Sequence, residues 1–438
     1  MTDQQLNLEH LWMPFSANRD FKNAPRLMNE AKGMYYKKPD GTEVLDGTAG
    51  LWCCNAGHGN EKIVSAIQEQ AAKMDYAPSF QMGHPLGFQA AQKLMEMVPA
   101  NDFQNVFFTN SGSEAVDTVL KIALAYQQHR GENERTILVG RERAYHGVGF
   151  GGITVGGLPL NKKYFTLLPD VDHICHTHDL EHNAFSKGEP EWGGHLANDL
   201  ERIIEKHGGQ KIAAVIVEPV AGSTGVLVPP KGYLKRLREI CTKHDILLIF
   251  DEVITGFGRM GKPFAAQYFD VEPDMITCAK GLTSGTVPMG AVMVKKEIYD
   301  AFQQGNPKSI DLFHGYTYTA HPLAAVAAIT ALEVYIEDGL FDRAAVLASY
   351  WEEALHSLQG VGSIIDIRTI GLMAGIEMEP RDNNVGERGY DIFCDAFHNH
   401  NLLVRVTADT VALSPPLIIE KEHIDQIVDT LRKIIPNH

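Results

Sequence analysis

Two short apolar stretches that each lead into a charged residue constrain this chain more than any other feature. Residues 246–250 read ILLIF and are followed by Asp251, and residues 275–278 read MITC and lead to Lys280. Uninterrupted apolar runs of this length are typical of strands that are covered on both faces in an α/β sheet. Since open α/β sheets bind ligands at the carboxyl ends of their strands, we expect Asp251 and Lys280 to face one crevice.

A carboxylate and an amine in one crevice suit the cofactor pyridoxal 5′-phosphate (PLP). The amine can form a Schiff base with the aldehyde of the cofactor, and the carboxylate can keep the pyridine nitrogen protonated, which makes the ring an electron sink. The alternative is an ordinary surface lysine and an aspartate that caps a turn, because charged residues are mostly exposed. The pair alone leaves both interpretations open.

The residues around the pair resemble a known signature. FDEVITGFGRMG (250–261) and TCAKG (277–281) are similar to the motif of the class III aminotransferases, in the fold type I group of PLP enzymes. The resemblance covers essentially the whole chain and is closest to the ω-amino acid:pyruvate aminotransferases. It implies that Lys280 is the Schiff-base lysine, that Asp251 is the partner of the pyridine nitrogen, and that Val253 packs on the ring face.

A turn between a predicted strand and a predicted helix is a candidate phosphate site. Residues 106–109 predict the strand, NSGS the turn, and Glu114 opens the helix. The free N–H groups at a helix N-terminus can hold a phosphate, although serine followed by acidic residues is also common in plain helix caps. The resemblance implies that Gly112 and Ser113 contact the cofactor phosphate.

The glycine-rich stretch 147–152 fits the dinucleotide pattern G-x-G-x-x-G. A lone match is weak, and we expect no amphipathic helix directly after it. The resemblance instead assigns Tyr145, His146 and Gly147 to a cofactor-binding motif in which the tyrosine ring lies against the pyridine ring. An aromatic side chain at that position can stack on the cofactor.

Two residues are candidates for substrate binding. Trp52 follows AGL in a glycine-rich stretch and packs under that loop in one interpretation, because tryptophan is usually buried. The resemblance implies that Trp52 forms the wall of the substrate pocket. Arg405 stands in a β-rich run, where a charge normally faces solvent. By resemblance Arg405 binds the substrate carboxylate through its guanidinium fork and swings aside for an uncharged substituent.

The motif HGYTYTAHP (314–322) bears on the oligomeric state. The resemblance implies that Thr317 binds the phosphate held by the neighbouring subunit. Each active site would then be built from two chains, so we expect a homo-oligomer, either a dimer or a tetramer. Glu218 ends its predicted strand at the same sheet edge as Asp251, and the sequence leaves open whether it acts directly.

The segment 160–198 is expected to be a long, irregular polar insertion, and it contains His173, Cys175, His176 and His178. The spacing of these residues does not match the paired motifs of structural zinc sites, so we expect no metal. Six cysteines in 438 residues, two of them adjacent, do not indicate a disulfide framework. This cysteine usage favours a reduced, cytoplasmic protein.

The charge and the N-terminal residues argue against several classes of function. The formal net charge of −16 argues against a nucleic-acid partner or an anionic membrane, since either would require a basic surface. No apolar run approaches the roughly 20 residues of a membrane helix. The N-terminal residues lack the basic segment and the apolar core of a signal peptide.

We therefore expect an α/β protein of fold type I, with a mostly parallel sheet flanked by helices and a smaller α+β domain. The large PLP-binding domain is expected at 61–325, and the small domain at 1–60 and 326–438.

The resemblance implies that the amino group of an ω-amino acid (β-alanine) or a related amine passes to pyruvate, which gives L-alanine and an aldehyde or ketone. The alternatives are another PLP enzyme of this group, such as an aminomutase or a decarboxylase, and a cofactor-free α/β binding protein.

Overall fold

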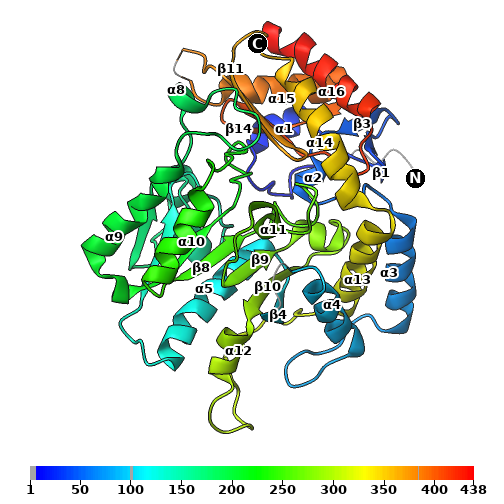
Figure 1. Cartoon of the computed structure of the whole chain (residues 1–438). Coiled ribbons are helices and arrows are strands. Elements are labelled where there is room, and N and C mark those ends of the chain that lie inside the picture. Colours follow the sequence, from blue (N-terminus) through cyan, green and yellow to red (C-terminus); the bar gives the residue numbers. More distant parts are fainter. Residues whose placement is uncertain (1–5, 99–101, 383) are drawn as a thin grey trace.

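A seven-stranded sheet forms the centre of the computed structural model, which describes residues 6–98, 102–382 and 384–438 (Figure 1). In spatial order its strands are β4 (Phe103–Thr109), β10 (Gly290–Lys295), β9 (Met275–Cys278), β8 (Leu247–Asp251), β7 (Ile212–Val217), β5 (Ile137–Arg141) and β6 (Val171–Ile174). The strands from β9 to β6 are all parallel, whereas β10 runs antiparallel to both of its neighbours. The sheet is therefore mostly parallel, as the sequence predicted.

Helices cover the central sheet on both faces, which explains the unbroken apolar runs of its inner strands. Every residue of β7 and β8 is buried. Alternate side chains of β7 belong to two different hydrophobic clusters, with Val215 and Val217 in one and Ala214 and Ile216 in the other. Helix α5 (Gly112–His129) contributes most of its buried side chains to the second cluster. This two-sided burial is the usual setting of a parallel sheet.

Two smaller sheets complete the β structure. One contains β1 (Glu30–Lys32), β2 (Tyr35–Lys37), β3 (Glu43–Asp46) and β13 (Leu402–Leu403). The other contains β11 (Ile364–Ile370), β12 (Met373–Met378), β15 (Thr410–Leu413) and β14 (Arg405–Thr407). Strand β13 pairs in parallel with β3, so segments from the two ends of the chain share a sheet.

The remaining helices surround these sheets (Figure 1). They are α1 (Asn18–Asn23), α2 (Ala49–Trp52), α3 (Glu61–Lys73), α4 (Pro85–Met95), α6 (Phe150–Val155), α7 (Pro159–Lys162), α8 (Leu180–Asn183), α9 (Asp199–His207), α10 (Tyr233–Lys243), α11 (Ala265–Phe269), α12 (Lys296–Phe302), α13 (Pro322–Glu337), α14 (Leu340–His356), α15 (Glu387–His400) and α16 (Lys421–Ile434), with 3-10 turns at Gly194–Asn198, Gly209–Lys211, Lys280–Thr283 and Ile435–Asn437. Among the described residues, each helix is too short or too polar to cross a lipid bilayer.

The segment 160–198 is more regular than its sequence predicted. It contains β6, which pairs in parallel with β5 at the edge of the central sheet, and the helices α7 and α8. The expectation of an irregular insertion was wrong here because β6 is an edge strand. The two middle residues of this four-residue strand, Asp172 and His173, are polar, so its sequence lacks the apolar run of a covered strand.

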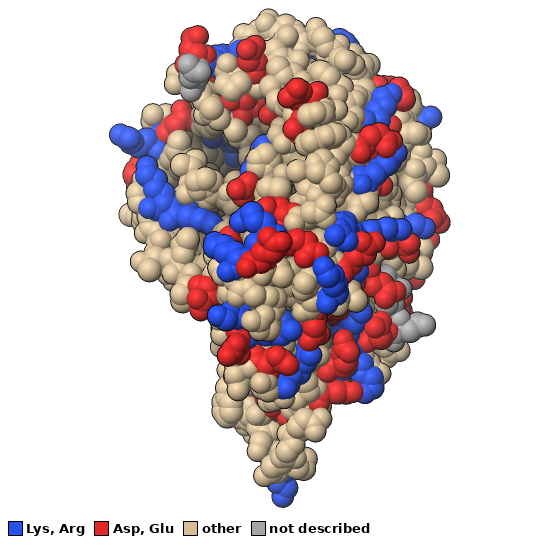
Figure 2. All heavy atoms as spheres, turned by 60° about the vertical axis from the view of Figure 1, so that its left-hand side comes forward, with Lys and Arg blue, Asp and Glu red and all other residues tan. Residues whose placement is uncertain are grey.

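Acidic and basic side chains are interleaved on the face shown in Figure 2. Ion pairs account for part of this pattern on α9 and α10, where Lys243 lies 3.1 Å from Glu201 and Arg236 lies 3.2 Å from Glu239. On these helices acidic side chains are thus paired with basic ones.

Candidate active site

Asp251 and Lys280 line one cavity of about 150 Å³ at the carboxyl ends of the central strands. Asp251 is the last residue of β8, and Lys280 follows the end of β9 by two positions. The two residues share one crevice, as the apolar runs predicted. The cavity is lined by Gly112, Ser113, Val116, Tyr145, His146, Gly147, Glu218, Asp251, Val253, Ile254 and Lys280.

Lys280 has two properties of a reactive amine. Burial lowers the pKa of its ammonium group from the ordinary 10.5 to about 8, and the nearby Asp251 opposes this shift only in part. Its backbone has φ +49°, a left-handed conformation that side-chain-bearing residues seldom adopt and that is often found at functional sites. Within the described chain, no side chain forms a hydrogen bond or ion pair with the amine.

Three donors hold the carboxylate of Asp251. The ring nitrogen Nδ1 of His146 lies 2.7 Å from Oδ2, the hydroxyl of Thr277 donates to Oδ1 at 3.1 Å, and the backbone N–H of Val253 donates to Oδ1 at 3.2 Å. His146 and Asp251 are almost completely buried. The second ring nitrogen of His146 has no hydrogen-bond partner among the described residues.

Glu218 places a second carboxylate in the cavity wall, directly after β7. Its Oε1 accepts a hydrogen bond of 2.9 Å from the backbone N–H of Tyr145, and its carbonyl oxygen accepts one of 2.9 Å from Arg141. Complete burial raises the pKa of Glu218 from 4.5 to about 7. Glu218 therefore positions the loop that carries Tyr145 and His146.

The N-terminus of α5 also lines the cavity, through Gly112, Ser113 and Val116. Ser111 caps the helix by accepting a hydrogen bond of 3.2 Å from Glu114 N, and Ser113 Oγ accepts one of 3.1 Å from Val148 N. A β-carbon added at Gly112 would lie only 2.8 Å from Val253 Cγ1. Glycine therefore suits the point where this turn approaches the residues that follow β8.

A second close approach lies beside that turn. A β-carbon added at Gly147 would lie 2.5 Å from Ser113 Oγ. Helix α6 begins at Phe150, inside the glycine-rich stretch, and five of its six residues are buried. This short, buried helix includes two of the glycines and is not the amphipathic helix that would follow a dinucleotide-binding turn.

These side chains fit pyridoxal 5′-phosphate. A buried amine of lowered pKa suits its aldehyde, a buried carboxylate suits its pyridine nitrogen, and the first N–H groups of a helix suit its phosphate. The cavity of about 150 Å³, whose wall includes Val253 and Tyr145, offers the space for a flat ring.

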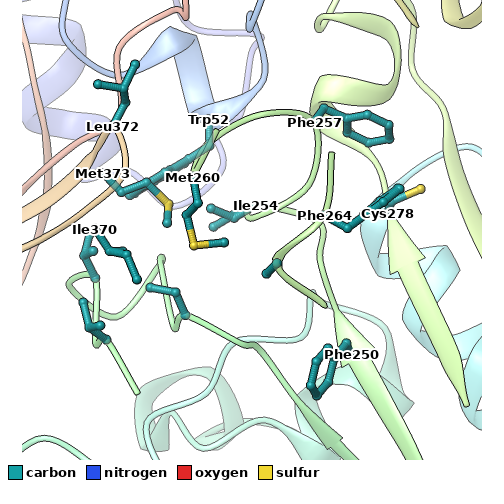
Figure 3. Close-up of a cluster of buried hydrophobic side chains, with 14 of the residues drawn as sticks. Trp52, Phe250, Ile254, Phe257, Met260, Phe264, Cys278, Ile370, Leu372 and Met373 are labelled. Atoms are coloured by element: carbon teal, nitrogen blue, oxygen red, sulfur yellow. The ribbon is translucent and has the colours of Figure 1, made fainter. Parts of the chain in front are cut away.

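Trp52 and Arg405 lie outside the group of side chains that line this cavity. Trp52 is 3% exposed and packs beside Met260 and Met373 in the hydrophobic core, with Ile254 close by (Figure 3). Its neighbours in this cluster come from distant segments, and one of them, Ile254, also lines the cavity.

Arg405 begins β14 and is half-buried. Burial lowers the pKa of its guanidinium group below the ordinary value, and the charge of the nearby Tyr145 opposes this shift. No hydrogen bond or ion pair joins this guanidinium to the described side chains, so its donors are available for an anion.

Thr317 is exposed on a loop of the same chain and does not line the cavity. Its carbonyl oxygen accepts a hydrogen bond of 3.1 Å from the hydroxyl of Tyr76. Large apolar side chains are exposed around this loop, with Phe80 at 61%, Phe313 at 88% and Tyr318 at 58% exposure. An apolar surface of this kind is typical of a protein contact.

The histidines of segment 160–198 are dispersed. His173 lies 2.8 Å from the carbonyl oxygen of Gly156, and His178 lies 3.2 Å from Glu377. Asp366 completes a group with His178 and Glu377, but Arg368 Nη1 pairs with both carboxylates. The acidic groups that a metal ion would need are thus already paired with a guanidinium.

Sequence reasoning missed Thr277 and Ile254. Thr277 is the only hydroxyl in MITC, and on the strand next to β8 its side chain can reach the end of that strand. The contact of Thr277 with Asp251 could be predicted from the pairing of β8 with β9, but not from the motif itself.

Comparison with known proteins agrees with this chemistry. Residues 16–435 match the family described as Aminotransferase class-III. An omega-aminotransferase from Caulobacter vibrioides is 59% identical over 98% of both chains. A beta-alanine–pyruvate aminotransferase from Pseudomonas aeruginosa is 46% identical over 98% of this chain and 95% of its own. A solved structure of the omega transaminase from Pseudomonas jessenii, in complex with PMP, superposes with a TM-score of 0.90 at 29% identity and covers 98% of both chains.

Proposed function

The chain belongs to the class III aminotransferases, and we propose that it transfers the amino group of β-alanine or a related amine to pyruvate. Its fold is that of the fold type I enzymes. The products would be L-alanine and an aldehyde or ketone. The observation that carries the proposal is the shared cavity of Lys280 and Asp251, in a chain whose relatives are omega- and beta-alanine–pyruvate aminotransferases.

The cavity residues divide into those that would hold the ring of the cofactor and those that would hold its phosphate. Lys280 would bind the aldehyde carbon, Asp251 would face the pyridine nitrogen, and Val253 and Tyr145 would lie on the two ring faces. His146 would hold Asp251 in place through the 2.7 Å contact. The N–H groups of Gly112 and Ser113, at the start of α5, would hold the phosphate. When it is bound, pyridoxal 5′-phosphate supplies an electron sink for the carbon that carries the amine.

Lys280 would also move the proton of the reaction. A pKa of about 8 leaves a useful fraction of the Nζ amine uncharged near neutral pH, so it can accept a proton from the amine-bearing carbon. The same atom can return that proton to a neighbouring carbon. Asp251, held by three donors, stays fixed during these transfers.

Arg405 would recognise the carboxylate that β-alanine and pyruvate have in common. The amine of β-alanine is one carbon farther from its carboxylate than the amine of alanine, so one pocket must serve two distances. A guanidinium with no fixed protein partner can move between them. Trp52 would shape the wall of this pocket through the apolar cluster it shares with Ile254.

A second copy of the chain would complete the site. Thr317 is exposed and surrounded by apolar side chains, which suits a homo-oligomer in which Thr317 reaches the phosphate of the partner's cofactor. The small domain would combine residues 1–60 with 326–438 around the large domain 61–325. The pairing of β3 with β13 supports this division.

The decisive assay is the formation of L-alanine from pyruvate with β-alanine or a panel of amines as donors. We expect the native chain to form it with PLP, and the Lys280→Ala variant to lose turnover and the visible absorbance of bound PLP. An aminomutase or a decarboxylase would retain PLP but form no alanine from pyruvate. A protein that stays colourless with added PLP would instead be a cofactor-free binding protein.

A further inference from the structure

The adjacent residues Cys53 and Cys54 form a pair of thiols beside the loop that follows Lys280. Their sulfur atoms lie 3.9 Å apart, and both side chains are half-buried, so the pair retains some exposure. All six cysteines are free thiols. Cys241 and Cys278 are buried, whereas Cys175 and Cys394 are half-buried at other places in the fold. The mechanism proposed above uses none of these thiols.

Hydrogen bonds of the two residues that follow the thiols, Asn55 and Ala56, fix this segment against the neighbouring loops, including the loop after Lys280. The backbone N–H of Ala56 donates to Ser284 Oγ at 2.9 Å, and the amide nitrogen of Asn55 donates to the carbonyl oxygen of Phe257 at 2.7 Å. A β-carbon added at Gly285 would lie 3.1 Å from both sulfur atoms. The two thiols therefore converge on one point of this loop, where glycine leaves space.

The surroundings also favour ionisation of one thiol. A hydrogen bond with Cys54 lowers the pKa of Cys53, and the positive charges of Lys280 and Arg259 act in the same direction. The same hydrogen bond and burial raise the pKa of Cys54. One sulfur is thus the better nucleophile, and the other lies within van der Waals reach of it.

We propose that Cys53 and Cys54 form a modification site that hydrogen peroxide converts reversibly into a disulfide between adjacent residues. The Cys53 thiolate attacks one peroxide oxygen, the O–O bond breaks, and hydroxide leaves, which gives a sulfenic acid. Cys54 then attacks that sulfur through its own sulfur and loses its proton, and the hydroxyl group leaves as water. In sum, two thiols and one hydrogen peroxide give one disulfide and two waters.

Such a bond would be strained and easily reduced. Neighbouring Cα atoms across a trans peptide are about 3.8 Å apart, whereas most disulfides join Cα atoms about 4.4–6.8 Å apart. Strained disulfides are the labile ones in thiol exchange. The sulfur atoms must also approach from 3.9 Å to about 2 Å, so the bond would distort the turn that directly follows Trp52. We expect turnover to fall in the oxidised form and to return on reduction.

The test treats the holoenzyme with hydrogen peroxide and then with a thiol reductant. The expected result is a mass loss of about 2 Da with a peptide that contains the Cys53–Cys54 link, since two hydrogens are removed. Turnover should fall roughly tenfold, because small displacements near a catalytic centre are costly, and should recover with the reductant. The mass readout does not depend on the proposed transaminase activity.

Two single variants and two controls complete the experiment. Cys53→Ser and Cys54→Ser should each keep basal turnover, abolish the mass loss and resist reversible inactivation. Cys175→Ser and Cys394→Ser should behave like the native chain. Three results would overturn the proposal: oxygen addition without loss of two hydrogens, a link between other cysteines, or a Cys53–Cys54 link that leaves turnover unchanged. If a serine variant fails to fold, the peptide map and turnover of the native enzyme decide.

Discussion

The ring nitrogen Nδ1 of His146 lies 2.7 Å from Oδ2 of Asp251, and both side chains are almost completely out of contact with solvent. His146 comes from the loop after β5 and Asp251 from the end of β8, so the contact joins two separate parts of the cavity wall. A buried carboxylate depends strongly on each of its donors, because nothing in the interior can replace them. The contact therefore fixes the carboxylate that would face the pyridine nitrogen.

Replacement of His146 should weaken cofactor binding. His146→Ala leaves Asp251 Oδ2 without its donor, at a cost of about 1.5–3 kcal/mol, or roughly 10- to 100-fold in the dissociation constant of PLP. Titration of the apoenzyme with PLP, followed by absorbance, measures this. His146→Asn keeps an N–H donor and should lose much less affinity. Equal losses in the two variants would show that the hydrogen bond is not the cause.

Arg405→Ala should affect substrates according to their charge. Loss of the guanidinium should lower kcat/KM for β-alanine and pyruvate by roughly 10- to 100-fold, the value of a charge-assisted hydrogen bond. An arylalkyl amine without a carboxylate should react nearly as before in its half-reaction with the PLP enzyme. Arg405→Lys is the matched variant, since it keeps the charge but lacks the fork. If the amine loses as much as β-alanine, Arg405 does not bind the carboxylate.

The reaction of the apoenzyme with PLP should depend on pH through Lys280. Because burial lowers the pKa of this residue to about 8, the uncharged amine increases as the pH rises and is dominant above that value. The rate of reconstitution should increase about tenfold per pH unit below 8 and level off above it. Stopped-flow absorbance provides the rates. A plateau that appears only near the ordinary pKa of 10.5 would refute the shift.

Glu218 should make the fold less stable as the pH rises from 4.5 to 7. In that range the folded chain retains a proton on Glu218, since its pKa is raised to about 7, whereas the unfolded chain has already released it. The stability of the folded state therefore falls across this window, by about 3 kcal/mol in total. Glu218→Gln should remove that part of the pH dependence, as measured by denaturant unfolding of the apoenzyme. Glu239→Gln, on an exposed position of α10, should leave it unchanged.

Thr317 provides a test of the shared active site. Lys280→Ala and Thr317→Arg chains should each be poorly active alone. If the site is built from two copies, a mixed dimer contains one intact site, with Lys280 from one chain and Thr317 from the other. Refolding the two variants together should therefore restore activity above that of either parent. Activity that never exceeds the parents would place Thr317 outside the site.

The two apolar runs predicted strands β8 and β9 and the position of Asp251 and Lys280 in one crevice. Every residue of β8 and β9 is buried, so each strand appears in the sequence as a continuous and mostly apolar stretch. The strand β6 was missed because it lies at the sheet edge and its inner residues are polar. Helices α15 and α16 were also not predicted, although their apolar residues recur at helical spacing.

The candidate site was predicted only in part, because several of its contacts join distant segments. The motifs around Gly112, Tyr145 and Lys280 could be read from local sequence. The contact of Thr277 with Asp251 depends on the pairing of β8 and β9, which no single motif contains. The burial of Trp52 against Met373 likewise depends on packing between segments more than 300 residues apart.

The parallel pairing of β3 with β13 has a consequence for synthesis on the ribosome. Leu45 pairs with Leu402, so β3 emerges about 350 residues before its partner exists. At about 5–20 residues per second, this interval lasts roughly 20 to 70 s. During that time the nascent chain can assemble its central sheet, while the early strand has an open edge. A sheet that closes only near the end of synthesis therefore contains one of the first strands to be made.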